Sequence, residues 1–203
     1  MEVAGRPLIA WCLDAFAAAE SVGAVVIAVP PGHEPEFAAL APGAVVVAGG
    51  KTRSQSVGAA LEHVESELVA VHDAARPLVT AGLVDTLVAR LAAHPDASGV
   101  IAAAPLADTV KRATGIDPES LTVAGTESRE HLWAAQTPQV FRTDELRVAH
   151  AADPARAASA TDDAALVEAQ GGTVLILEAP ARNLKITTPA DLEVTAALLE
   201  ARP

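Results

Sequence analysis

The sequence predicts an α/β fold in which helices cover both faces of a mainly parallel β-sheet. Short apolar runs rich in β-branched residues alternate with amphipathic stretches along the chain. The runs are continuously apolar, which is typical of strands covered on both faces. Repeated βα units of this length favour parallel pairing of the strands. At 203 residues the chain fits one domain with a substantial core.

The expected elements follow one another in chain order. We expect helices over residues 7–22, 54–64, 81–94 and 189–201, and strands over residues 24–30, 44–48, 68–71, 99–104 and 174–177. Thr188 can cap the last helix. Residues 108–141 are mixed polar and β-prone, and we interpret them as an arm within the domain. The Ala-rich stretch 151–160 is expected to be a loop.

The composition argues against several classes of function. A net charge of −12 and only 2% aromatic residues disfavour nucleic-acid binding, which needs basic surface and stacking side chains. The single cysteine excludes an intramolecular disulfide and a cysteine-cluster zinc site. Neither a membrane span nor a secretory signal is visible, so we expect a soluble cytoplasmic protein. A phosphorylated small ligand is compatible with the charge, because a few convergent basic groups suffice.

In parallel α/β sheets ligands bind beyond the carboxyl ends of the strands. The segment GGKTRSQS, residues 49–56, lies between an expected strand and a helix. Its glycines allow a sharp turn, and Arg53 with the serine hydroxyls can donate to phosphate, ribose or base. The alternative is a structural turn in which Ser54 caps the helix. A Walker A loop is excluded by the spacing.

The segment VHDAARP, residues 71–77, follows another apolar strand. Asp73 suits Mg²⁺, which takes one or two carboxylates together with phosphate oxygens. Arg76 can bind a phosphate or hold the loop in shape. The alternative is that Asp73 caps a turn and Arg76 forms a structural ion pair. Lys185, in the later segment NLKIT, lies between apolar neighbours, where a lysine more commonly extends to the surface.

Taken together, these segments resemble the 2-C-methyl-D-erythritol 4-phosphate cytidylyltransferase family. The matching segments are AGRPLIAW (4–11), GGKTRSQSV (49–57), VHDAARPL (71–78), APLADTVKR (104–112), LWAAQTPQVF (132–141), TDDAALVE (161–168) and NLKITTPADL (183–192). The resemblance implies a Rossmann-like nucleotidyltransferase fold of the glycosyltransferase-A-like type, spanning residues 1–203. It also implies a homodimer interlocked through the β-arm.

The implied reaction joins CTP and methylerythritol phosphate into CDP-methylerythritol and pyrophosphate, with Mg²⁺ as cofactor. By this resemblance Lys185 and Asp73 are catalytic, and Asp73 holds the metal. The nucleotide-binding positions are Gly50, Arg53, Ser56, Asp73 and Ala74; the substrate-binding positions are Thr109, Arg129, Thr137 and Lys185, some contributed by the partner subunit.

The chain departs from the family pattern at its start. Members carry a strand and a glycine-rich loop, A-A-G-x-G-x-R, upstream of the segment that here is AGRP and lies close to Met1. We interpret Met1 as an internal methionine, reached through a misplaced start or a truncation. Without that strand, neighbouring backbone groups are expected to be unpaired and activity to be nearly absent. Lys51 stands where some members have an acidic residue.

Three other functions stay open on the sequence. The related ribitol-5-phosphate cytidylyltransferases share part of the motif set. A non-catalytic nucleotidyltransferase-like assembly subunit would keep the arm without the loop. A broader NDP-sugar pyrophosphorylase shares the fold but not the HDAARP and NLKIT pair.

Overall fold

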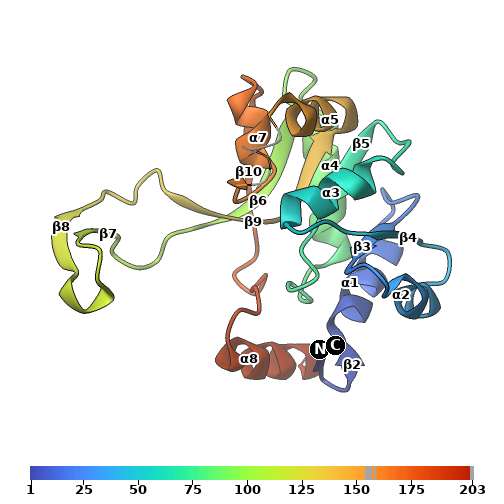
Figure 1. Ribbon diagram of the computed structural model, residues 1–203, viewed down its shortest axis with the longest axis horizontal. Helices are drawn as coiled ribbons and strands as arrows, with labels where there is room; N and C mark the ends of the chain where they lie inside the picture. Colours follow the sequence, from blue (N-terminus) through green and yellow to red (C-terminus); the bar gives the residue numbers. More distant parts are fainter. Residues whose placement is uncertain (154–156, 158, 202–203) are drawn as a thin grey trace.

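The computed structural model describes residues 1–153, 157 and 159–201, and it confirms the α/β class (Figure 1). The strands are β1 (Glu2–Val3), β2 (Arg6–Pro7), β3 (Val26–Val29), β4 (Val45–Ala48), β5 (Leu68–Val71), β6 (Gly99–Pro105), β7 (Lys111–Thr114), β8 (Thr122–Thr126), β9 (Trp133–Arg142) and β10 (Val174–Glu178). The helices are α1 (Leu8–Ala17), α2 (Glu34–Leu40), α3 (Arg53–Leu61), α4 (Ala81–Ala92), α5 (Thr143–Ala152), α7 (Ala164–Ala169) and α8 (Pro189–Glu200), with a short 3-10 turn at Pro118–Ser120.

The described strands form a mixed four-stranded sheet, the parallel pair β3–β4 and the antiparallel pairs β1–β2 and β7–β8. The central sheet has the order β10-β6-β9-β5. Within it β10 is parallel to β6, whereas β9 is antiparallel to both β6 and β5. Strands β3 and β4 pair in parallel with each other. Apart from β9, the strands of the central sheet therefore run in one direction, and their carboxyl ends share an edge.

Side chains on β6 point alternately to the two faces of the central sheet. Val100 and Ala102 pack with Leu87 of α4 on one face. Ile101 and Ala103 pack on the other face with apolar side chains of α3, α5 and α7. This alternation follows from the two-residue period of a strand. The expected arrangement, with helices on both faces, is present.

A cavity of about 740 Å³ lies between the β3–β4 pair and the central sheet. Its walls include Phe16 of α1, Ile27 of β3, Val57 of α3 and Val69 of β5. Among the described strands, β3 pairs only with β4, and β5 pairs only with β9. The two strand edges beside the cavity therefore have no β-ladder partner. The cavity reaches the end of β5, where the candidate site lies.

The hairpin of β7 and β8 projects from the body of the protein (Figure 1). The projecting part ends before residue 141, because β9 returns to the central sheet from Trp133, which pairs with Pro105. Phe141 is fully buried there. The expected Ala-rich loop at 151–160 is wrong at its start, because Ala151 and Ala152 belong to α5. Residues 154–156 and 158 of that stretch lie outside the described residues. Among the described helices, none has the length and apolar character needed to cross a bilayer.

Candidate active site

Three charged side chains meet at the carboxyl edge of the strands. Arg53 Nε donates to Asp73 Oδ1 at 2.9 Å, and Lys185 Nζ donates to Asp73 Oδ2 at 2.9 Å. Arg53 begins α3, Asp73 lies two residues beyond β5, and Lys185 precedes α8. The structure thus brings together three predicted site residues that are far apart in the sequence. Their roles in binding and catalysis stay predictions.

The charges in this cluster support one another. Burial alone would raise the pKa of Asp73, but the hydrogen bonds and charges of Lys185 and Arg53 outweigh it and lower that pKa. Burial would likewise lower the pKa of Arg53, but the carboxylates of Asp163 and Asp73 raise it. Asp73 is therefore an anion held between two cations at neutral pH. Such a cluster can exchange its internal ion pairs for contacts with a charged ligand.

The loop before α3 is shaped by packing against the first turn of that helix. Thr52 caps the helix in a capping box with Gln55, so Ser54 is not the cap. A Cβ atom on Gly50 would lie 2.3 Å from Gln55 Cβ, which explains the glycine. Gly50 N–H donates to Ser56 Oγ at 3.1 Å. Gly50 and Ser56 therefore shape the loop, and their contacts with a nucleotide stay predictions.

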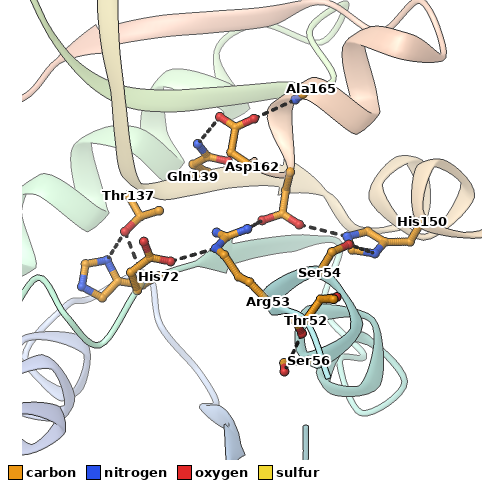
Figure 2. Close-up of polar contacts among 12 residues, drawn as sticks. Thr52, Arg53, Ser54, Ser56, His72, Thr137, Gln139, His150, Asp162 and Ala165 are labelled. Carbon is orange, nitrogen blue, oxygen red and sulfur yellow. Dashed lines mark hydrogen bonds and ion pairs between the residues drawn. The ribbon is translucent and has the colours of Figure 1, made fainter. Parts of the chain in front are cut away.

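The backbone of Asp73 is fixed by a buried hydrogen-bond chain, part of which Figure 2 shows. Asp73 N–H donates to Thr137 Oγ1 at 3.0 Å, and Thr137 Oγ1 lies 3.1 Å from His72 Nδ1 (Figure 2). His72 Nε2 lies 3.2 Å from the carbonyl oxygen of Arg76. These partners assign the neutral His72 tautomer that donates from Nε2 and accepts at Nδ1. Burial lowers the pKa of His72 to about 4, in agreement with that form.

The loops that carry Asp73 and Lys185 are joined by buried polar contacts. Arg76 Nη1 donates to the carbonyl oxygen of Asn183 at 2.8 Å, and Ile186 N–H donates to that of Ala75 at 2.8 Å. Arg76 is buried, so these contacts favour its structural interpretation over phosphate binding. The connection holds Lys185 beside Asp73.

The other predicted substrate residues do not join this cluster within one chain. Thr109 and Arg129 are exposed and lie on the segments that lead to and from the arm hairpin. Arg129 Nη1 donates to the carbonyl oxygen of Leu106 at 3.3 Å. Thr137 is buried, and its hydroxyl already contacts His72 and Asp73. Ala74 is exposed next to Asp73.

Two residues of the cluster were not predicted. Asp163 Oδ2 accepts from Arg53 Nη1 at 2.7 Å, and His150 Nε2 lies 2.9 Å from Asp163 Oδ1. In Figure 2, dashed lines run from Arg53 and from His150 to the unlabelled carboxylate between them, which these two contacts identify as that of Asp163. The segment TDDAALVE carried the signal, since it belonged to the family pattern, but no role was assigned to its acidic residues.

The carboxylate of Asp73 is compatible with Mg²⁺ binding. No group of three or more histidine, cysteine, aspartate or glutamate side chains able to hold a metal occurs in the described part of the chain. Mg²⁺ can be held by one carboxylate when substrate phosphates supply further oxygens. Asp73 meets that requirement, because a carboxylate has more lone pairs than the two N–H contacts use.

Comparisons with known proteins agree on one family. The model of the family "IspD: 2-C-methyl-D-erythritol 4-phosphate cytidylyltransferase" matches residues 1–201. A protein of that name from Gloeobacter violaceus is 42% identical over 98% of this chain and 87% of its own length. A protein of the same name from Prochlorococcus marinus is 39% identical over 100% of this chain and 89% of its own length. A crystal structure of this enzyme from Thermus thermophilus, 38% identical, superposes with a TM-score of 0.83 over 98% of this chain and 92% of that one.

Proposed function

The chain belongs to the 2-C-methyl-D-erythritol 4-phosphate cytidylyltransferase family. We therefore propose that it transfers CMP from CTP to 2-C-methyl-D-erythritol 4-phosphate. The products are CDP-methylerythritol and pyrophosphate, in non-mevalonate isoprenoid biosynthesis. The family match across residues 1–201 is the observation that carries this conclusion. The cluster of Arg53, Asp73 and Lys185 supports it, because a triphosphate needs convergent cations.

The reaction is an in-line displacement at phosphorus. A phosphate oxygen of the acceptor forms a bond to the α-phosphorus of CTP, and the bond from that phosphorus to the α,β-bridging oxygen breaks. The electron pair of the broken bond leaves with pyrophosphate. Negative charge is spread over the phosphoryl oxygens in the transition state, so catalysis depends on positioning and on nearby cations. In the proposal Lys185 supplies such a cation, and Asp73 orients it.

The remaining site residues are assigned by the same proposal. Gly50, Arg53 and Ser56 border cytosine, and Ala74 lets the ribose approach the end of β5 closely. Thr109, Arg129 and Thr137 serve the methylerythritol phosphate. The exposed positions of Thr109 and Arg129 near the arm support a contribution to the partner's site. Asp73 would hold Mg²⁺ together with CTP phosphate oxygens, and the bound ion would offset their charge.

Pyrophosphate release tests the proposed reaction directly. The purified chain is incubated with CTP and Mg²⁺ and with either methylerythritol phosphate or ribitol 5-phosphate. Slow release that depends on methylerythritol phosphate, and that is faster than with ribitol 5-phosphate, is the expected result. Faster release with ribitol 5-phosphate would overturn the acceptor assignment. Absence of release with either acceptor would favour a non-catalytic assembly subunit.

We propose that the reaction takes place in the cytoplasm, where CTP is available.

The proposed dimer rests on the apolar surface of the arm. Ile116, Leu121 and Val123 are exposed on the β7–β8 hairpin, and two strands alone are only marginally stable in water. We therefore expect a solution mass twice the 20.6 kDa of one chain. Replacing both Ile116 and Val123 with aspartate should give monomers, because charge would oppose burial of this surface.

Size-exclusion chromatography with light scattering measures this mass. Val148→Asp provides the matched control, since Val148 is also exposed but lies on α5, away from the arm. A dimer that survives both arm substitutions would contradict the proposed interface.

A further inference from the structure

Asp163 occupies the N-cap position of α7, yet it does not cap that helix. No hydrogen bond joins its side chain to the first turn of α7. The neighbouring Asp162 takes this role, since its Oδ1 accepts from Ala165 N–H at 3.1 Å. Aspartate at an N-cap is ordinarily explained by capping. That explanation does not account for Asp163, which is fully buried.

Both carboxylate oxygens of Asp163 point away from α7 and contact ionisable side chains. Oδ2 accepts from Arg53 Nη1 at 2.7 Å, and Oδ1 lies 2.9 Å from His150 Nε2. Behind this contact, His150 Nδ1 lies 3.5 Å from Ser54 Oγ. A buried carboxylate is strongly unfavourable unless it is paired. Asp163 is therefore held in place from both sides.

The same contact restricts Arg53 more than one ion pair would. Arg53 is the first residue of α3, where the helix dipole opposes a positive charge. Asp73 and Asp163, from different parts of the chain, bind its Nε and Nη1 atoms at 2.9 and 2.7 Å. Because the guanidinium group is planar, two contacts at different nitrogens fix its position and its plane.

We propose that Asp163 is a positioning residue, which fixes the Arg53 guanidinium for nucleotide binding while His150 holds Asp163 from behind. This rests on the proposed function, in which CTP binds beside Arg53. Arg53 donates its Nε–H to Asp73 and one Nη1–H to Asp163. Its other N–H groups have no hydrogen-bond acceptor among the described residues. Arg53 also lines both the large cavity and a small cleft that includes Lys185. The remaining N–H groups are available to nucleotide oxygens.

Calorimetric titration with Mg²⁺ and CTP tests this role in the whole chain. Asp163→Asn keeps the side-chain shape but removes the charge, and it should weaken CTP binding about tenfold, as expected for coupled neighbouring groups. In an Arg53→Met background the same substitution should cause no further loss. Asp144→Asn, which removes the exposed pair with Arg147, is the matched control and should leave binding unchanged. Weaker folding of Asp163→Asn with unchanged CTP affinity would show a merely structural role and overturn the proposal.

NMR of the arginine side chain provides a measurement that requires neither CTP binding nor a stable variant. In the wild-type chain the Arg53 Nη1–H group, which Asp163 binds, should exchange with water much more slowly than the Nη–H groups of the exposed Arg182. Equal exchange rates would overturn the positioning role. If the wild-type chain binds no CTP while Arg53 exchanges slowly, the proposed function fails but the fixation of Arg53 stands. The two failures are therefore distinguishable.

Discussion

Replacing Asp73 with asparagine is expected to lower pyrophosphate release by about 100-fold or more, the range for loss of a group that organises transition-state charge. Asp73 accepts hydrogen bonds from Arg53 and Lys185, and its pKa is lowered, so its negative charge is present at neutral pH. Asparagine would leave Lys185 without its counter-charge and would leave Arg53 paired with Asp163 alone. It would also remove the carboxylate proposed to hold Mg²⁺.

Initial rates with CTP and methylerythritol phosphate, measured over a series of Mg²⁺ concentrations, provide the test. Asp14→Asn is a suitable control, because it removes the carboxylate of the exposed pair between Arg6 and Asp14, outside the site. Its rate should equal that of the wild type. A rate for Asp73→Asn within threefold of the wild type at every Mg²⁺ concentration would contradict the assigned role.

Acid should destabilise the protein through His72. Its pKa is about 4 in the folded chain, against an ordinary value of 6.5. Between these two pH values the unfolded chain binds more protons at His72 than the folded chain does. The contribution of His72 to the free energy of unfolding is therefore complete above pH 6.5 and is lost as the pH falls toward 4. The shift corresponds to about 3 kcal/mol of unfolding free energy between pH 7 and pH 4.

Urea unfolding of the wild type and of His72→Gln at pH 7 and pH 4 isolates this contribution. Glutamine can still donate to the Arg76 carbonyl and accept from Thr137 but does not titrate. The wild type should lose about 3 kcal/mol more than the variant over this interval. Equal losses in the two proteins would show that His72 is not the group responsible. Protonation of Nδ1 would also stop this atom from accepting the Thr137 hydroxyl proton, so the direction of that hydrogen bond would reverse.

The sequence predicted four helices and five strands that the structure contains, because burial produces a local periodic pattern, but it did not predict α2, α5 or α7. The strand at Leu68–Val71 and the helix starting at Ala81 begin where the pattern indicated. Residues that follow parallel strands lie at one edge of a sheet, which is why Asp73 and Arg53 could be expected to lie near each other. Lys185 was assigned only through the family resemblance, since a lysine among apolar residues has a simpler explanation at the surface.

Other features depend on partners that no local pattern specifies. The antiparallel direction of β9 is set by pairing with both β6 and β5, so a β-prone segment taken for arm became a central strand. Thr137 matched a substrate position, but the return of β9 buries its hydroxyl between His72 and Asp73. Asp163 had the sequence position of an ordinary helix cap.

The sequence by itself determined the α/β class, the family, and the strand ends at which charged residues gather. Periodicity and short motifs depend only on residues that are close together in the sequence. Tertiary structure alone decided which charges are paired. Arg53 meets Asp163 across 110 positions and Asp73 across 20. The free energy of a buried carboxylate depends on whichever cation the fold brings to it, and that cation can come from any part of the chain.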